Sequence, residues 1–310
     1  MKMRVAMIGC GAVGSIHAAY LASQPDVELT AVYSPEPDSA VTFAGRYGVR
    51  TIAASVEDAV AATDAAIVCS PSAVHFEQAR ACLRAGQHTL IELPPCSEPR
   101  EAEELGTIAR QQGVVVGCAH TSRYLVPYAH VQAAIQSGLL GQIQEISYIR
   151  YPQLRPRAWI DNALVHHAAH IIDLAMQWCG GLEPLACTAF PDASSAQSVS
   201  LLAMLPGGKS LTAAISYGAK LPISQMVVVG TKHTLETDGF SYLRSDILQS
   251  DIEELQFAGD ERIVYEQAIV AQDAQFFGAC RGENTYIPWA ETENLMYMIH
   301  RFKMLTAVRP

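Results

Sequence analysis

One short stretch of the chain concentrates side chains that could transfer a proton. It has the sequence HHAAHIID, residues 166–173, and lies in a predicted helix. On a helix, His166, His170 and Asp173 share one face, and His167 lies beside them. A neutral imidazole accepts a proton near physiological pH, so we predict His170 as the general base for a hydroxyl proton. His166 would polarise or position the same oxygen, and Asp173 would orient an imidazole.

The histidines also allow other interpretations. Some of them, His167 above all, could be core residues bonded to backbone carbonyls. The spacing of His166 and His170 suits zinc as well, with Asp173 as a third ligand. No glutamate follows the first histidine as in HExxH zinc enzymes, and we predict no metal. A lysine base is disfavoured, because residues 3–208 contain no lysine.

A glycine-rich motif, GCGAVG at residues 9–14, follows an apolar strand pattern and opens a helical one. In this context the motif predicts a dinucleotide site. The first glycine makes a tight turn, the second lets the backbone approach a pyrophosphate, and the third lets the helix pack on the strand. The helix N-terminus supplies N–H donors for the phosphates. A glycine-rich turn without a ligand is the alternative. The predicted contacts are Gly9, Gly11, Ala12, Val13 and Gly14.

The end of the second expected strand bears on the choice between NAD and NADP. An acid there holds the ribose of NAD, whereas an arginine accommodates the extra phosphate of NADP. The strand ends at Ser34, and residues 5–45 contain no arginine or lysine. Glu36 and Asp38 would repel a phosphate, although both could also belong to a solvated turn. We expect NAD or NADP as cofactor and favour NAD, with Ser34 as the ribose contact.

The elements that must position these residues differ between the two parts of the chain. The first 120 residues alternate β-rich and helical patterns, which predicts a doubly wound parallel sheet of the Rossmann type. The expected strands span residues 4–8, 27–33, 65–69, 88–91 and 114–119, and the expected crossover helices span residues 13–22, 40–47, 56–61, 73–85 and 100–111. Later β-rich runs separated by turn signals predict an α+β fold with a mostly antiparallel open sheet. A helix is expected at residues 163–179 of this second domain. We predict a dinucleotide-binding domain at residues 1–120 and a substrate and oligomerisation domain at residues 121–310.

Further motifs carry a family resemblance across nearly the whole chain. They are CSPSAVH at residues 69–75, AGQH at 85–88 and IELP at 91–94, together with the glycine motif and the histidine stretch. In this combination the chain resembles the Gfo/Idh/MocA oxidoreductases. The resemblance implies that the loop after the fourth strand and the family's Glu-Lys-Pro motif line the nicotinamide. The residues at those positions are Ser70, Pro71, His75, Glu92 and Leu93.

Two departures from the family pattern concern the catalytic groups. The usual lysine is Leu93, and the usual acid four residues before the helix histidine is His166. A branch of semialdehyde dehydrogenases within the family also lacks the lysine, and the chain resembles that branch at HTSR, residues 120–123, and RAWID, residues 157–161. This resemblance implies oxidation of the cyclic hemiacetal of a carboxylated semialdehyde to a pyrone lactone, in the degradation of aromatic compounds. The branch carries arginines suited to NADP at the end of the second strand, where this chain has Ser34.

Arginines supply candidate contacts for a carboxylated substrate. Arg150, Arg155 and Arg157 lie in a segment without acids, and guanidinium groups bind carboxylates through paired hydrogen bonds. We favour a binding role for Arg123 and Arg157, and surface positions against tyrosines for Arg150 and Arg155. The full set of predicted substrate contacts is His120, Arg123, Arg157 and Trp159.

Composition restricts the class of protein. The chain has 310 residues, half of them apolar, and a formal net charge of -10, which disfavours nucleic acid as a partner. No apolar run is long enough to span a membrane, so we expect a cytoplasmic protein. An open sheet commonly pairs with a second copy, which predicts a homodimer or homotetramer. The alternatives to a semialdehyde dehydrogenase are a sugar or cyclitol dehydrogenase of the same family, a dinucleotide-binding sensor or regulatory subunit without turnover, and a metal-assisted lyase or hydrolase.

Overall fold

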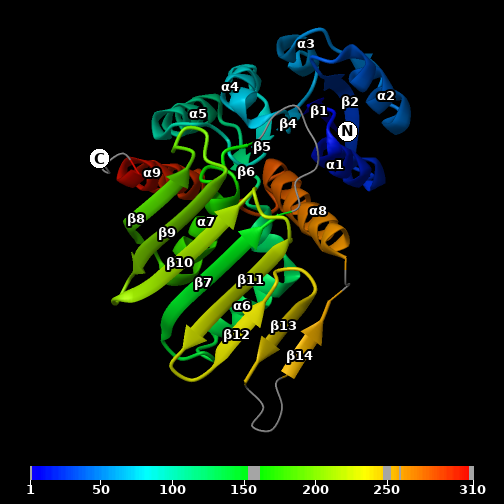
Figure 1. The fold of residues 1–310 in the computed structure, drawn as a ribbon. Coiled ribbons are helices and arrows are strands. Elements are labelled where there is room, and N and C mark those ends of the chain that lie inside the picture. Colours follow the sequence, from blue (N-terminus) through cyan, green and yellow to red (C-terminus); the bar gives the residue numbers. More distant parts are fainter. Residues whose placement is uncertain (1, 153–160, 247–252, 258–259, 307–310) are drawn as a thin grey trace. The chain divides into compact units, whose positions relative to one another are not determined.

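The computed structural model describes residues 2–152, 161–246, 253–257 and 260–306 (Figure 1). The chain divides into two compact units: Met1–Ala119 with Ile269–Met296, and His120–Ala268 with Tyr297–Pro310. No helix in the described ranges is long and apolar enough to cross a membrane.

The first unit is built on a six-stranded sheet in which all strand pairs are parallel. Its strand order is β3-β2-β1-β4-β5-β6, as a doubly wound fold requires. The strands are β1 (Met3–Ile8), β2 (Val27–Tyr33), β3 (Thr51–Ile52), β4 (Ala65–Val68), β5 (His88–Ile91) and β6 (Val116–Cys118). This confirms the predicted fold class. β3 is not predicted from the sequence, because it has only two residues and both are exposed.

Helices connect these strands. They are α1 (Ala12–Ser23), α2 (Pro37–Tyr47), α3 (Val56–Val60), the short 3-10 helix η1 (Ser72–Val74), α4 (His75–Arg84) and α5 (Pro99–Gln112). Local sequence explains their ends. α5 begins with a proline and a capping box between Glu98 and Glu101, and both α2 and α5 end at a left-handed glycine, Gly48 and Gly113.

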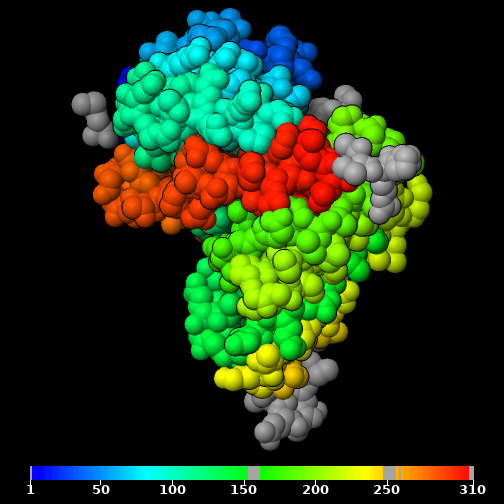
Figure 2. Space-filling view, turned by 90° about the vertical axis from the view of Figure 1, so that its left-hand side faces the viewer, coloured from blue at the N-terminus to red at the C-terminus, as the bar shows by residue number. Residues whose placement is uncertain are grey.

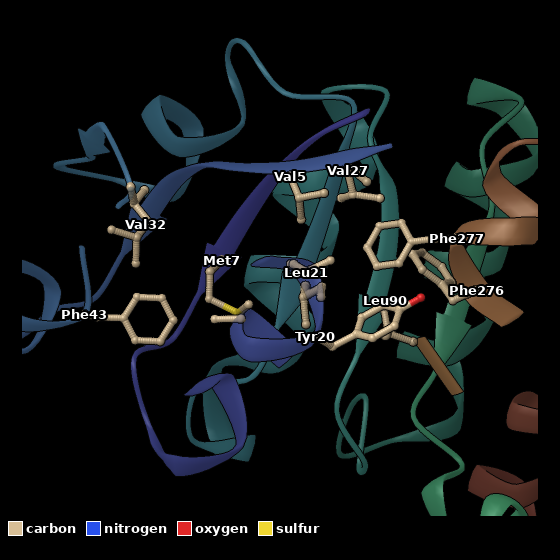
Figure 3. Packing of buried hydrophobic residues seen from close by; sticks show 14 of the residues in the cluster. Val5, Met7, Tyr20, Leu21, Val27, Val32, Phe43, Leu90, Phe276 and Phe277 are labelled. Carbon is tan, nitrogen blue, oxygen red and sulfur yellow. The ribbon is translucent and has the colours of Figure 1, made fainter. Parts of the chain in front are cut away.

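The segment Ile269–Met296 packs into the first unit, although it follows most of the second unit in sequence. Phe276, Phe277 and Tyr286 join the apolar cluster around β1 (Figure 3). The Trp289 ring nitrogen donates a 2.8 Å hydrogen bond to the carbonyl of Ala102 in α5. Figure 2 shows the orange surface of this segment against the cyan and green-cyan surface of the first unit. This segment falls within the second domain predicted from the sequence, residues 121–310. Its packing partners in the first unit lie far away in sequence, so no local pattern indicates them.

The second unit contains an eight-stranded sheet in the order β14-β13-β12-β11-β7-β10-β9-β8. Among the described strands, β7 and β10 alone pair in parallel, so the sheet is mostly antiparallel as predicted. The strands are β7 (Ile143–Tyr151), β8 (Glu183–Phe190), β9 (Ser198–Leu205), β10 (Lys209–Ser216), β11 (Ile223–Gly230), β12 (Thr234–Thr237), β13 (Tyr242–Ser245) and β14 (Glu253–Gln256). The helical elements of the unit are η2 (Thr121–Tyr124), α6 (Val126–Gln136) and α7 (His167–Cys179), with parts of α8 (Glu261–Cys280) and α9 (Trp289–Thr306).

One face of this sheet packs against helices and the other does not. In β9 buried and exposed residues alternate, with Leu201 and Ala203 buried and Leu202 and Met204 exposed. Figure 1 shows α6 and α7 behind the sheet, and within the described residues no helix covers the face toward the viewer. α7, with its histidines, therefore packs on the helix-covered face of the sheet.

Candidate active site

The residues predicted to bind a dinucleotide follow the carboxyl ends of four parallel strands. The glycine motif follows β1, Ser34 follows β2, Ser70 and Pro71 follow β4, and Glu92 and Leu93 follow β5. Carboxyl ends of parallel strands meet at one edge of a sheet, and the strand order changes direction between β1 and β4. The structure therefore brings these residues to the edge where this topology binds ligands.

The three motif glycines differ in what surrounds them. Gly9 has a φ of +115°, and a Cβ there would lie 2.7 Å from the backbone of Cys69. A Cβ on Gly14 would lie 2.6 Å from the carbonyl oxygen of Gly9. Gly11, the residue before α1, would place a Cβ in open space with no atom within 4 Å. The first and third glycines are thus needed for packing, whereas the second leaves room for a ligand at the helix N-terminus. A pyrophosphate fits this arrangement.

The loops after β4 and β5 are tied together below that edge. His75 is buried, with Nδ1 2.7 Å from the carbonyl oxygen of Pro94 and Nε2 2.6 Å from that of Ser70. The Ser70 hydroxyl donates a 3.2 Å hydrogen bond to the carbonyl of Ile8. The Leu93 side chain is also buried. His75 therefore holds the two loops together, and a contact of His75 or Leu93 with the nicotinamide stays a prediction.

The end of β2 is an acidic turn. The Ser34 hydroxyl oxygen accepts a 3.2 Å hydrogen bond from the backbone N–H of Glu36, and Ser39 donates to the Glu36 carboxylate at 2.9 Å. Asp38 lies in the first turn of α2, and the arginine of that helix, Arg46, lies in its last turn. The acids thus lie beside the expected ribose position, and the nearest arginine in sequence lies at the far end of the helix.

The second unit brings the three helix histidines together. The ring centroids of His166 and His167 are 4.4 Å apart, and the His170 ring lies 6.1 Å from the first and 6.3 Å from the second. His166 is the residue before α7 rather than part of it. The Tyr217 hydroxyl lies 2.8 Å from Nδ1 of His167 and 3.4 Å from Nδ1 of His166.

The His170 ring is kept in its neutral form. Burial, and after it the positive charge of a protonated His166, lower the pKa of His170 to about 3. His120 and Arg150 act in the same direction, and Asp173 opposes them. A neutral imidazole has a free lone pair, so His170 is able to accept a proton throughout the neutral range.

Asp173 belongs to a buried group with partners from η2 and the residue before it. Arg123 donates to both carboxylate oxygens, at 2.8 and 2.5 Å, and His120 Nδ1 lies 3.1 Å from Oδ1. Burial alone would raise the pKa of Asp173, but the charges and hydrogen bonds of His120 and Arg123 outweigh it and hold that pKa well below its usual range. Asp173 therefore lies against the His120 imidazole, and its role in orienting a ring of the histidine stretch stays a prediction.

This arrangement changes the expectation for Arg123 and His120. Both side chains are buried, and the paired N–H groups of Arg123 bond Asp173. A paired clamp on a substrate carboxylate at Arg123 would require this salt bridge to break, so substrate contact at Arg123 and His120 stays a prediction. The salt bridge with Arg123 also occupies the carboxylate that the zinc alternative requires as a third ligand. Within the described ranges, no cluster of three or more His, Cys, Asp or Glu residues is arranged to hold a metal.

Of the three arginines in the acid-free segment, the structure describes only Arg150. Arg155, Arg157 and the predicted contact Trp159 lie outside the described residues. Arg150 is not the surface residue expected from the sequence. Its side chain is only 12% exposed, stacks over Phe240 with 4.9 Å to the ring centroid, and forms an ion pair with Glu261.

Three further residues, which the sequence patterns do not predict, lie in these sites. Tyr217 bonds the histidines from the end of β10, and its only sequence signal was a Tyr-Gly turn. His17 and Asp273 lie in the first unit, on α1 and α8, and bond each other across 256 positions of sequence. A lone histidine on an apolar helix carries no local signal of such a partner.

The fold and the glycine motif define the first unit as an NAD-binding Rossmann domain. A family model described as the oxidoreductase family with an NAD-binding Rossmann fold, GFO_IDH_MocA, matches residues 3–120. Residues 3–120 of the chain thus match the Gfo/Idh/MocA oxidoreductase family.

Similar proteins differ in the substrates that their names give. The chain is 33% identical over 182 residues to 4-carboxy-2-hydroxymuconate-6-semialdehyde dehydrogenase of Sphingobium sp. (strain NBRC 103272 / SYK-6). The aligned region covers 56% of this chain and 58% of that protein. The chain is 32% identical over 144 residues to D-glucoside 3-dehydrogenase of Escherichia coli (strain K12), covering 46% and 41%. The chain thus spans about half the length of these relatives. UDP-N-acetylglucosamine 3-dehydrogenase from Acidithiobacillus ferrooxidans shares the fold, with a TM-score of 0.83 and 21% identity over 99% of both chains.

Proposed function

We propose that the protein is an NAD(P)-dependent dehydrogenase that oxidises the cyclic hemiacetal of a carboxylated semialdehyde to a lactone. The observation that carries this proposal is the neutral His170 imidazole, which lies beside the rings of His166 and His167. The other unit of the chain has the sheet edge at which a dinucleotide is expected to bind. A nicotinamide dinucleotide held by the glycine motif and the loops after β4 and β5 would supply the hydride acceptor for the hemiacetal carbon. The hydroxyl on that carbon loses its proton to His170, and the carbon–oxygen double bond of the lactone forms.

The low pKa of His170 is compatible with this role. As the hydride leaves, the substrate oxygen becomes that of a protonated lactone, which is a far stronger acid than an imidazolium ion. A weakly basic but neutral imidazole can therefore take the proton. His166 would position the same oxygen, and Tyr217 would hold the rings of His166 and His167 in place through its hydroxyl.

The substrate class rests on two lines of support. The relative at 33% identity is named for a carboxylated semialdehyde. Arg157 and Arg123 are candidate partners for carboxylates. D-Glucoside 3-dehydrogenase is similar at nearly the same identity, so a sugar or cyclitol is the second candidate substrate.

A substrate screen with both cofactors tests this proposal. We expect reduced nicotinamide, measured by its absorbance, to form with carboxylated semialdehydes, and kcat/KM with NAD to equal or exceed that with NADP because Glu36 and Asp38 disfavour the extra phosphate. Turnover of sugars or cyclitols alone would refute the substrate class. Tight dinucleotide binding without any turnover would instead indicate a sensor or regulatory subunit.

We also propose that the uncovered sheet face of the second unit binds a second copy of the chain, in a cytoplasmic homodimer or homotetramer. Leu202 and Met204 on this face are 38% and 43% exposed, and apolar surface of this kind is commonly buried between subunits. Sedimentation should give a dimer or larger, and Leu202→Glu should shift it toward the monomer. A monomeric wild type would exclude this assembly.

A further inference from the structure

The first unit contains a buried imidazole held between two carboxylates. Nδ1 of His17 lies 2.6 Å from Oδ2 of Asp273, and Nε2 lies 3.0 Å from Oε1 of Glu92. The side chains of His17 and Asp273 are fully buried, and that of Glu92 is 14% exposed. The reaction proposed above uses none of these contacts.

The geometry fixes the charge of this cluster. A neutral imidazole has one N–H and one lone pair, so it can satisfy only one of two ionised carboxylates. The cluster therefore holds an additional proton, on the ring or on a carboxyl group. Burial lowers the pKa of His17, but Asp273 and Glu92 outweigh it and raise that pKa to about 10, and burial raises the pKa of Asp273. Wherever the shared proton resides, the three groups together carry one net negative charge near neutral pH.

The cluster lies at the dinucleotide edge of the sheet. α1 begins directly after Gly11 and carries His17 in its second turn, and Glu92 directly follows β5. The charges of Glu92 and Asp273 also contribute, after burial, to raising the pKa of Cys69 at the end of β4. The cluster is therefore close to the loop that contains the motif glycines.

The position of Glu92 along the carboxyl-end edge of the sheet indicates which half of the dinucleotide the negative charge of the cluster would affect. In this topology the adenosine ribose binds at the end of β2, on one side of the point where the strand order changes direction. The nicotinamide half therefore belongs to the other side, with β4 and β5. Glu92 lies on that side.

We propose that the cluster of His17, Glu92 and Asp273 biases the bound cofactor toward its oxidised form. This inference rests on the dinucleotide site described above and not on the identity of the substrate. The oxidised nicotinamide ring carries a positive charge that the reduced ring lacks. A fixed negative charge in surroundings of low dielectric constant stabilises only the charged ring. The cluster would consequently raise the affinity for the oxidised cofactor relative to that for the reduced one.

The test compares the dissociation constants of NAD and NADH in the absence of substrate, by fluorescence titration. The double variant Glu92→Gln/Asp273→Asn replaces both carboxylates by amides, which can still form hydrogen bonds with a neutral His17, so the net negative charge of the cluster is lost. We expect it to weaken NAD relative to NADH by roughly tenfold, the order expected for unit charges in a partly buried region. Either single variant can keep a net negative charge, because a neutral imidazole satisfies the one carboxylate that remains.

Glu104→Gln is the matched control, because it makes the same charge change on an exposed part of α5 and should leave both constants unchanged. A purely structural role would weaken NAD and NADH by the same factor. An unchanged ratio in the folded double variant would therefore overturn the proposal, and Glu92→Ala/Asp273→Asn makes the same charge change should the first double variant fail to fold. A wild-type protein that bound neither form would refute the dinucleotide site itself, whereas failure to find a substrate would not affect this measurement.

Discussion

Replacing His170 by alanine is expected to lower kcat by about 10²- to 10⁴-fold, the usual contribution of a positioned general base. The variant removes the imidazole that the structure keeps neutral. Cofactor affinity should stay at the wild-type value, because the dinucleotide residues belong to the first unit and His170 to the second. Steady-state kinetics together with a cofactor titration measures both quantities.

The neighbouring histidines serve as matched controls for this prediction. His166→Ala should cost less than His170→Ala if His166 only positions the oxygen, and His167→Ala should cost least, because that ring bonds Tyr217. The pH profile provides a second check. Because the pKa of His170 is about 3, kcat/KM should not fall through its protonation until the pH approaches that value. Near-full turnover in both His170→Ala and His166→Ala would mean that the histidines are structural.

Most strands of the first unit could be predicted from sequence because they are continuous β-rich runs, whereas the two exposed residues of β3 give no such signal. β2 and β5 begin and end at the predicted residues, since each is a continuous β-rich run. The start of α7 could not be predicted in the same way. Asn162 accepts hydrogen bonds from the backbone N–H groups of Leu164 and Val165, which holds a turn before the helix and leaves His166 outside it.

The two candidate sites differ in how far sequence determines them. The dinucleotide edge depends on loops that directly follow strands, so a local pattern locates its residues. The environment of Asp173 depends on Arg123, 50 positions earlier, which folds back onto it. Nothing in the spacing of the histidine stretch indicates that this carboxylate is paired outside its own helix. The same holds for His17 and Asp273, whose contact depends on the return of α8 to the first unit.

Replacing Gly11 by valine is expected to weaken dinucleotide binding by roughly 100-fold or more without unfolding the protein. Gly11 has φ of -78° and ψ of -170°, an extended conformation that valine adopts readily. No atom lies within 4 Å of the added Cβ, so the protein alone tolerates the side chain. A pyrophosphate at the N-terminus of α1 would lose its close approach to the backbone, and with it the N–H contacts that bind it. Calorimetric titration with NAD measures the loss, and thermal unfolding measures the stability.

Two glycine variants make this test specific. Gly45→Val adds the same side chain on the exposed part of α2, where the Cβ also meets no atom within 4 Å, and should leave NAD binding unchanged. Gly14→Val should instead lower the melting temperature, because its Cβ would lie 2.6 Å from the carbonyl oxygen of Gly9. Wild-type affinity in a folded Gly11→Val variant would mean that the open space beside Gly11 is not where the pyrophosphate binds. Equal loss of affinity in Gly45→Val would show that the effect comes from the valine side chain anywhere in the unit rather than from contact with the phosphates.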